Sequence, residues 1–462
     1  MRKIFRLLLI ISFLCICLAG QISQETGKGA LVAKARYLVG ALSANNFKGA
    51  IRDFDAAMLK VAGPEKMAEA WKMVTGKLGA FKKQGDARKE QQAPYDIVFI
   101  TCEFEKEMLD IRVTFDKEKH IAGFHFVPTQ LGSYQPPAYS SPGLFEEKDV
   151  IVGSGDWLLP GTLTIPKGNG PFPALVLVHG SGANDRDETL GSNKPFKDLA
   201  WGLASRGIAV LRYEKRTRVY GAKLKGDQEF ANSFTVGDET IEDALAAVIL
   251  LKTENAIDPK KIFVLGHSLG GMLIPRIAAE GKNLDIAGFI IMAGATRKFE
   301  DMFLEQTNYV ATLDGSLSED EKKQIAEIEK SVKKIKALKK SDLQSQETIL
   351  MAPVSYWLDL NEYDPVKVVK DIRQPILVLQ GARDYQVATE DFENWKKALS
   401  PSTGENTDFK LYPMLNHLFF EGKGKSTPDE YMKIRENIAE YVINDIAGWL
   451  KKSSEPVIKS VK

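Results

Sequence analysis

One stretch of this chain, residues 260–274, constrains its fold more than any other. A run of apolar residues typical of a buried strand leads into Gly266-His267-Ser268-Leu269-Gly270, and a segment typical of a helix follows. This G-x-S-x-G pattern places a serine on a strained turn with its hydroxyl exposed at the edge of a sheet. Its glycines let other backbone pass close by, and the N-terminus of the following helix favours negative charge there. The pattern in this context predicts that Ser268 is a nucleophile.

A serine nucleophile needs a base, and the sequence contains five histidines that could supply it. His120 and His125 lie far upstream, in a separate region of the chain. His179 ends an earlier strand, and His267 is inside the turn, where its position is expected to point it away from the serine hydroxyl. The remaining histidine, His417, follows a strand-like segment and is therefore the predicted base.

The acid that orients the base is expected after a later strand, between the serine and the histidine in the chain. Residues 375–381 form an apolar run typical of a buried parallel strand, and Asp384 follows it directly. Asp391 and Glu393 are competing carboxylates, but both are expected in the next helix with their side chains in water. The predicted acid is therefore Asp384, which would hold the imidazole and stabilise its cationic form.

An earlier apolar run, residues 173–178, ends in His179-Gly180-Ser181-Gly182. In a site of this kind the oxyanion is bound by the N–H of the residue after the nucleophile and by an N–H of such a loop. The predicted donors are the backbone N–H groups of Leu269 and Ser181. His179 itself is interpreted as a residue that shapes the loop.

These stretches resemble the α/β-hydrolase superfamily over roughly Glu146 to Leu450, and within it the bacterial carboxylesterases of the EstD type, close to the serine aminopeptidase-like and lysophospholipase-like branch. The resemblance is carried by residues 179–188, 266–271, 381–387 and 415–419. It implies hydrolysis of carboxylic esters, with Ser268, Asp384 and His417 as a catalytic triad. Many relatives have an aromatic-Asp-x-Arg-Gly sequence where this chain has Tyr213-Glu-Lys-Arg-Thr217, and this departure concerns the conformation of that loop.

The chain, at 462 residues, is long enough for two domains, and strands alternate with helices through its second part. The strands are expected near residues 149–152, 158–165, 173–179, 208–214, 262–267, 287–293, 375–380 and 408–413. This alternation predicts an α/β-hydrolase domain over residues 146–451, with two antiparallel strands first and a doubly wound parallel sheet after them.

The interval 296–370 interrupts this alternation and predicts a helical cap inserted at the catalytic edge, because connections in α/β units usually have only a few residues. Ser318-Glu319-Asp320-Glu321 predicts the capped start of an amphipathic helix. Five apolar residues either line an acyl pocket or merely seat the cap on the sheet: Met302, Phe303, Met351, Tyr356 and Trp357.

The chain begins with basic residues, a short apolar run and small residues, which predict a signal peptide over residues 1–20. The apolar run is shorter than the roughly 20 residues that a membrane-spanning helix needs. Cys15 and Cys17 raise the question of a lipoprotein anchor, but the bulky residues before them disfavour it. We therefore expect a periplasmic or secreted enzyme with no stable membrane insertion after signal cleavage.

Residues 27–128 are expected to form an accessory domain, and residues 129–145, rich in Pro, Gly, Ser and Tyr, a linker. Helical patterns near residues 31–39, 50–61 and 65–78 precede alternating strands near 97–104, 108–115 and 120–126. This order predicts a small α+β domain. It is similar to the nuclear-transport-factor-like fold and to an accessory domain of unknown function that precedes some exported hydrolases. It would support a homo-oligomer or surface attachment, or be a folded spacer. Cys102, the single cysteine after signal cleavage, is expected in its core.

Basic and acidic side chains number 62 and 61, so nothing in the charge suggests nucleic acid as a partner. The sequence has no zinc-type spacing of Cys and His, and no metal or organic cofactor is implied. The expected function is an exported serine hydrolase acting on small-molecule esters with short to medium acyl chains. The alternatives are a thioesterase, a non-catalytic binding protein, and a serine peptidase or acyl-peptide hydrolase. A peptidase would bind the amino group of its substrate through acidic residues, for which Glu300, Asp301 and Glu305 are the candidates.

Overall fold

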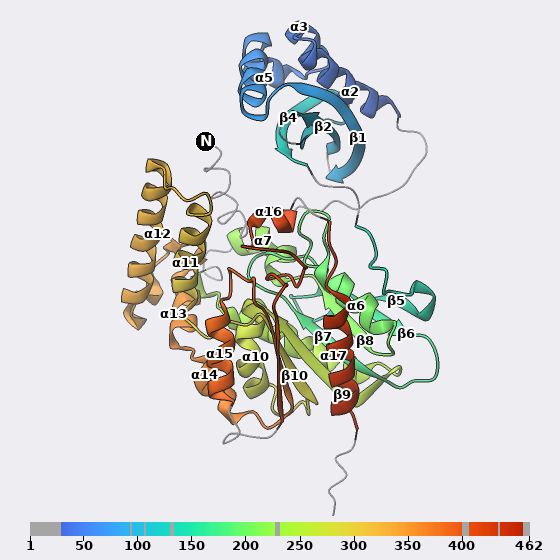
Figure 1. Ribbon diagram of the computed structural model, residues 1–462, viewed down its shortest axis with the longest axis vertical. Coiled ribbons are helices and arrows are strands. Elements are labelled where there is room, and N and C mark those ends of the chain that lie inside the picture. The colour runs from blue at the N-terminus through green and yellow to red at the C-terminus, as the bar shows by residue number, and fades with distance from the viewer. Residues whose placement is uncertain are drawn as a thin grey trace, which may run out of the picture. The chain divides into compact units, whose positions relative to one another are not determined.

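The structure is a computed structural model that describes residues 29–92, 95–105, 108–129, 134–226, 232–399, 406–432 and 435–455 (Figure 1). The chain divides into two compact units, whose described parts begin at residue 29 and at Tyr134. The predicted signal peptide lies outside the described residues. No helix in the described ranges combines the length and the hydrophobicity needed to span a membrane.

The first unit places its helices before an antiparallel sheet, as the sequence predicts. Its elements are α2 (Gly29–Ser43), α3 (Phe47–Ala50), α4 (Ala56–Val61), α5 (Pro64–Leu78), β1 (Phe81–Gln92), β2 (Tyr95–Phe104), β3 (Met108–Phe115) and β4 (Ile121–Pro128). The strands pair in the order β1-β2-β3-β4, which is a meander. Cys102 is fully buried in the core of this unit, and burial raises the pKa of its thiol to about 12.

One prediction for this unit was wrong, and one strand was missed. The helix predicted over residues 50–61 is interrupted, because Asp55 leaves the helical path: its N–H donates to the carbonyl of Ile121, and its carboxylate caps α4 by accepting a 2.7 Å hydrogen bond from the N–H of Met58. Strand β1 was not predicted, because its residues are almost all polar. It is held by the ladder to β2 rather than by apolar alternation of its own.

The second unit is built on an eight-stranded sheet in the order β14-β13-β10-β9-β7-β8-β6-β5. The strands are β5 (Phe145–Val152), β6 (Leu159–Pro166), β7 (Phe172–Val178), β8 (Ala209–Tyr213), β9 (Ile257–His267), β10 (Gly288–Met292), β13 (Ile376–Gly381) and β14 (Thr407–Tyr412). β5 and β6 are antiparallel to each other, and β6 is antiparallel to β8, while the remaining pairs are parallel. The predicted α/β-hydrolase fold is therefore confirmed.

Helices cover both faces of this sheet, so its central strands are buried on both sides. In β7, Val176 and Val178 join one core, and Leu175 and Leu177 join the other. The helices on the first face are α9 (Glu242–Thr253), α10 (Leu269–Glu280) and α15 (Thr389–Ala398), and those on the second are α6 (Pro195–Ala204) and α17 (Glu440–Ser453). Helix α7 (Arg216–Gly226) follows β8.

The predicted insertion lies between β10 and β13. Its helices are α11 (Phe299–Ala311), α12 (Glu319–Ala337), α13 (Val354–Glu362) and α14 (Pro365–Val368), and the two-stranded β11 (Thr348–Ile349) and β12 (Ala352–Pro353) precede α13. Helices α11 and α12 pack side by side at one flank of the unit (Figure 1). Ser318 and Glu321 form the predicted capping box of α12, and the predicted apolar face from Ile325 to Ile335 is buried.

Part of the predicted linker belongs to the second unit. From Tyr134 onward the chain lies on the hydrolase: the hydroxyl of Tyr134 donates a 2.8 Å hydrogen bond to Asp198, and that of Tyr139 donates one of the same length to the carbonyl of Ile438. Strand β5 then starts at Phe145. The prediction of a linker over the whole of 129–145 was therefore too long.

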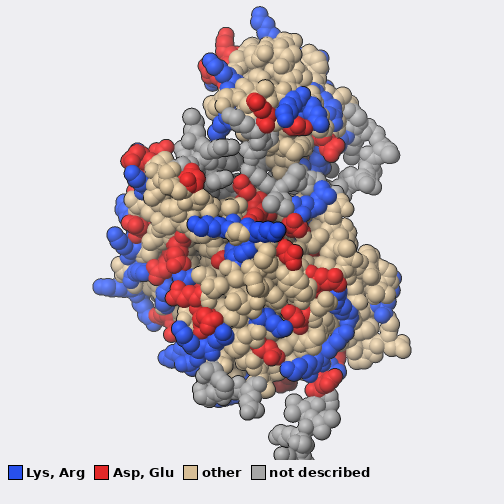
Figure 2. Space-filling view, in the orientation of Figure 1, with Lys and Arg blue, Asp and Glu red and all other residues tan. Residues whose placement is uncertain are grey.

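Basic and acidic side chains are interspersed on the face shown in Figure 2. On the insertion they form ion pairs, such as Lys336 with Asp301 at 2.6 Å and Lys334 with Glu347 at 2.5 Å. Exposed pairs of this kind contribute little to stability, about 0 to 1 kcal/mol each. The insertion therefore owes its stability mainly to its buried apolar residues, those of α12 among them.

Candidate active site

Ser268 lies on a strained turn between β9 and α10. Its φ of 54° and ψ of −116° are values that a non-glycine residue rarely adopts. The turn is tight: a Cβ on Gly266 would lie 2.2 Å from the carbonyl oxygen of Gly270, and a Cβ on Gly270 would lie 2.5 Å from that of Val178. The N–H of Ser268 donates a 3.0 Å hydrogen bond to the carbonyl of Met292, which holds the turn to the neighbouring strand β10.

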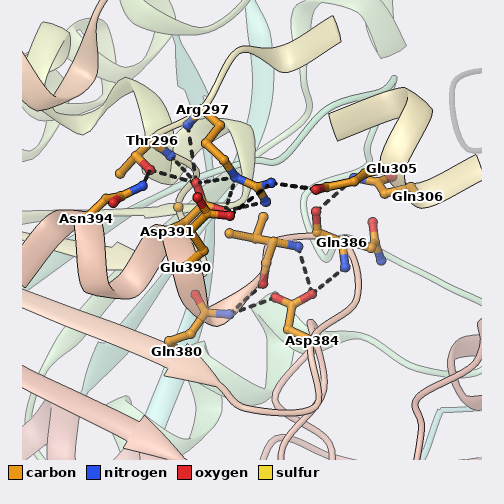
Figure 3. A network of polar contacts seen from close by, with 12 residues as sticks. Thr296, Arg297, Glu305, Gln306, Gln380, Asp384, Gln386, Glu390, Asp391 and Asn394 are labelled. Carbon is orange, nitrogen blue, oxygen red and sulfur yellow. Dashed lines mark hydrogen bonds and ion pairs between the residues drawn. The ribbon is translucent and has the colours of Figure 1, made fainter. Parts of the chain in front are cut away.

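The loops after β13 and β14 bring Asp384 and His417 together. Nδ1 of His417 donates a 2.7 Å hydrogen bond to Oδ2 of Asp384, and both side chains are buried. The carboxylate also accepts from Nε2 of Gln380 at 3.1 Å, and from the N–H groups of Gln386 and Val387 at 2.7 and 3.0 Å (Figure 3). Since Nδ1 carries a proton, Nε2 of a neutral His417 carries the free lone pair that a general base needs.

His267 connects the turn that carries Ser268 to the loop that carries His417. Its Nε2 lies 3.0 Å from the carbonyl oxygen of His417. In the described part of the chain the hydroxyl of Ser268 makes no hydrogen bond of standard geometry to His417. In unliganded sites such contacts commonly tighten only once substrate is bound.

The two predicted oxyanion donors also lie at this turn. Leu269 begins α10, and Ser181 follows Gly180, on which a Cβ would lie 3.1 Å from the Cβ of Ser268. Among the described residues neither the N–H of Leu269 nor that of Ser181 donates to a protein acceptor. Both are therefore available to a ligand oxygen.

A pocket opens at Ser268 beneath the insertion. It is lined by Ser181, Ser268, Leu269, Met272, Ala295, Phe299, Met302, Phe303, Gln306, Tyr385, Gln386 and Val387. Met302 and Phe303 were predicted for this pocket. Phe299 and Met272 were not, although Phe299 is the first residue of the same helix α11, one turn before Phe303.

The other three predicted pocket residues lie elsewhere. Met351 is 44% exposed in the turn between β11 and β12. Tyr356 is buried and donates a 2.8 Å hydrogen bond to Glu239, and Trp357 is buried and donates one to the carbonyl of Ile349. Tyr356 and Trp357 therefore pack the insertion against the core of the hydrolase unit, which is the alternative that the sequence left open, and Met351 does neither.

The three acidic residues that could have bound the amino group of a peptide substrate do not line the pocket. Asp301 and Glu305 are paired with Lys336 and Arg297. Glu300 is 2% exposed, and burial raises the pKa of its carboxyl. Among the described residues that line the pocket there is no carboxylate.

Asp391 does not face water, so that prediction was wrong. It is fully buried and binds the guanidinium of Arg297, and it accepts hydrogen bonds from the N–H and hydroxyl of Thr296 (Figure 3). Arg297 also reaches Glu305 on α11 (Figure 3). This network ties the start of the insertion to α15. Glu393 is exposed, as predicted, and pairs with Lys396.

Sequence analysis missed a buried acid at the site, Glu188. Its Oε1 accepts a 2.6 Å hydrogen bond from the N–H of Gly180, and its Oε2 lies 2.8 Å from Nδ1 of His267. Burial alone would raise the pKa of Glu188, but the charge of His267 brings that pKa below its usual value. Burial alone would lower the pKa of His267, but Glu188 brings that pKa above its usual value.

The loop around Gly180 is held from two further sides. Nζ of Lys215, in the stretch where the chain departs from many relatives, donates a 2.7 Å hydrogen bond to the carbonyl of Gly180. His179 is buried between the rings of Phe196 and Tyr213, and burial lowers its pKa to about 4. Its place fits the predicted role in shaping the loop.

The comparisons with known proteins agree with this architecture. Residues 175–433 match the family described as "Alpha/beta hydrolase family", and residues 35–124 match "Protein of unknown function (DUF3887)". The chain belongs to the alpha/beta hydrolase family. Within it the chain is of the carboxylesterase type: it is 39% identical to Esterase EstD of Thermotoga maritima over 424 residues, which are 92% of this chain and 96% of that one.

Two solved structures are also similar. A hyperthermophilic esterase from the archaeon Pyrobaculum calidifontis is 16% identical, with 66% of this chain and 85% of that chain covered and a TM-score of 0.44. A puromycin-hydrolyzing peptidase of Mycobacterium tuberculosis is 15% identical, with 81% of this chain and 48% of that chain covered and a TM-score of 0.44.

Proposed function

We propose that this chain is an exported hydrolase that cleaves small carboxylic esters through Ser268, His417 and Asp384. The observation that carries the proposal is the 2.7 Å hydrogen bond between buried Asp384 and His417 at the edge of the sheet where Ser268 stands on its strained turn. The similarity to Esterase EstD over nearly the whole of both chains supports the reaction.

The reaction would proceed through an acyl-enzyme. Nε2 of His417 takes the hydroxyl proton of Ser268 as the serine oxygen bonds to the ester carbonyl carbon, and the N–H groups of Leu269 and Ser181 bind the resulting oxyanion. The imidazolium, stabilised by Asp384, gives its proton to the departing alcohol. Water, deprotonated by His417, then attacks the acyl-enzyme, and collapse of the second oxyanion releases the acid and reprotonates Ser268.

The pocket favours an uncharged acyl group of short to medium length. Met272, Phe299, Met302 and Phe303 give it an apolar wall. A peptidase that binds the free amino group of its substrate would need a carboxylate in this pocket lining. Asp301 and Glu305 form ion pairs with Lys336 and Arg297 instead. Export to the periplasm or the medium is proposed from residues 1–20 of the sequence alone.

The test compares wild type with Ser268→Ala on p-nitrophenyl esters from acetate to palmitate and on aminoacyl nitroanilides. We expect ester turnover that falls by about 10⁴-fold or more in the variant, with the anilides untouched. Hydrolysis of the anilides with weak ester turnover would favour the peptidase alternative. Turnover of acyl thioesters above that of matched oxygen esters would favour a thioesterase. If no substrate is turned over in a way that depends on Ser268, the remaining hypothesis is a non-catalytic binding protein.

A further inference from the structure

Glu188 connects three backbone segments of the candidate site. Its two carboxylate oxygens accept from the N–H of Gly180 at 2.6 Å and from Nδ1 of His267 at 2.8 Å. The other ring nitrogen of His267 lies 3.0 Å from the carbonyl oxygen of His417. Each of these three positions is, or directly precedes, a group assigned to the reaction: Gly180 precedes Ser181, and His267 precedes Ser268.

The partners of His267 determine its protonation. A carboxylate and a backbone carbonyl both accept hydrogen bonds and cannot donate them. Both ring nitrogens of His267 must therefore donate, so the ring is an imidazolium that is paired with Glu188. Because both side chains are buried, with exposed fractions of 4% and 5%, water does not compete for these contacts.

The charged groups around the pair are few. His267 faces Glu188 and, at longer range, Asp384, and its ring centroid lies 4.8 Å from that of His417. Glu188 faces His267 and the neutral His179.

The backbone of Glu188 has a φ of 50°, a left-handed conformation that is unfavourable for a residue with a Cβ. The contacts of its side chain must therefore hold this conformation in place.

We propose that Glu188 and His267 are positioning residues, which set the oxyanion loop, the nucleophile turn and the backbone of the catalytic histidine in one arrangement. The proposal rests on the proposed function. Neither side chain exchanges a proton or a bond with the substrate in the proposed reaction, although the ring of His267 packs against that of His417. Glu188 fixes Gly180 and so the donor N–H of Ser181, and His267 fixes the loop from which His417 reaches the serine. Loss of the pair would therefore slow the chemical step more than it weakens substrate binding, since displacements of about 1 Å can cost about 10²-fold in rate.

Two substitutions at Glu188 separate hydrogen bonding from charge. In Glu188→Gln the amide oxygen can still accept from Gly180, and the amide nitrogen can donate to Nδ1 of a neutral His267, whose Nε2–H still reaches His417. In Glu188→Ala all of this is lost. Glu305→Gln, which removes an acid outside the pocket lining, is the matched control.

The experiment measures kcat and KM for p-nitrophenyl butyrate, the rate of labelling by a fluorophosphonate, thermal melting, and the ¹⁵N spectrum of the histidine rings. We expect kcat to fall by about 10²-fold in the alanine variant with KM little changed, and the glutamine variant to recover most of it. In wild type at neutral pH one histidine should show both ring nitrogens protonated, and this signal should be lost in both variants but not in Glu305→Gln.

Three results would overturn the proposal: a wild-type kcat in Glu188→Ala, a glutamine variant as slow as the alanine variant while both melt like wild type, or a His267 that carries one ring proton. If wild type hydrolyses no ester, the proposed function fails instead, and the ring spectrum still decides whether the Glu188–His267 pair exists as described.

Discussion

Asp384 accepts hydrogen bonds from three other groups besides His417, so its carboxylate has no freedom to turn. Gln380, the N–H of Gln386 and the N–H of Val387 occupy the acceptor positions that His417 leaves. These contacts hold the carboxylate at one orientation, and with it the orientation of the His417 ring, whose Nδ1 donates to it.

Asp384→Asn should therefore lower kcat by about 10⁴-fold with KM little changed, because an amide facing Nδ1 favours the wrong tautomer of His417. Steady-state kinetics on p-nitrophenyl butyrate measure the effect. Glu393→Gln, an exposed acid on the next helix, is the control and should behave as wild type. A kcat within tenfold of wild type for Asp384→Asn would mean that another acid orients His417.

Phe303→Ala should shift the preference for acyl chains towards longer ones. Phe303 lines the pocket and packs edge-to-face on Phe299 at 5.2 Å, so its removal lengthens the apolar cavity. The ratio of kcat/KM for octanoate to that for butyrate should rise by about tenfold, since one methylene group in an apolar pocket is worth about 1–3 kcal/mol.

The control for this prediction is Met351→Ala. Met351 was also predicted to line the pocket, but it is exposed in a turn of the insertion. Its chain-length profile should match that of wild type. A shift in Met351→Ala equal to that in Phe303→Ala would show that the insertion as a whole, and not the wall at Phe303, sets the preference.

The parts that could be predicted from the sequence share a physical origin. Parallel strands covered on both faces are continuous apolar runs, so β7, β9 and β13 are evident in the sequence, and Ser268 and Asp384 are found because each follows such a run. Strand β1 carries no such run, because its residues are mostly polar and its place depends on β2.

The role of Glu188 could not be predicted from the sequence, because no local sequence pattern indicates it. It lies in a loop, and its role depends on a positive φ and on contacts with Gly180 and with His267, which is 79 positions away. The apolar residues of the insertion pose a related difficulty. Trp357 and Phe303 have the same character in sequence, and only the tertiary packing separates the one that seats the insertion from the one that faces Ser268.

Lys215→Met should destabilise the fold and slow the reaction. Lys215 is 1% exposed, and its ammonium binds the carbonyl of Gly180 and lies 3.4 Å from Glu239. Removing one member of a buried ion pair costs about 3–5 kcal/mol, because the remaining charge stays buried. A drop in melting temperature together with a lower kcat is expected.

The double variant Lys215→Met with Glu239→Gln should recover part of that stability. The amide leaves no buried charge: its oxygen can accept from one of the two hydroxyls that now bind Glu239, those of Thr217 and Tyr356, and its NH2 group can donate to the oxygen of the other. The kcat should stay low, because the carbonyl of Gly180 still lacks its partner. Thermal melting and kinetics on wild type and these two variants separate the two effects. A double variant no more stable than Lys215→Met would contradict the ion-pair account.

Asp198 should make the stability of the hydrolase unit fall as the pH rises towards neutrality. It is fully buried where Tyr134, Asn437 and the N–H of Ile438 converge, and burial raises the pKa of its carboxyl to about 7. In the unfolded chain the pKa of an aspartate is about 3.9. Between these values the folded state binds the extra proton, so the free energy of unfolding decreases with rising pH across this window and levels off above it.

Asp198→Asn removes this titration, and it removes the charge without removing the acceptor oxygen that faces Tyr134. The difference in melting temperature, wild type minus variant, should therefore be larger at pH 5 than at pH 8. Asp445→Asn is the control, since Asp445 also accepts a hydrogen bond from a tyrosine, Tyr412, but is only partly buried. If the difference for Asp198→Asn stays constant from pH 5 to pH 8, then Asp198 is already ionised at pH 5 and its three donors outweigh the cost of burial.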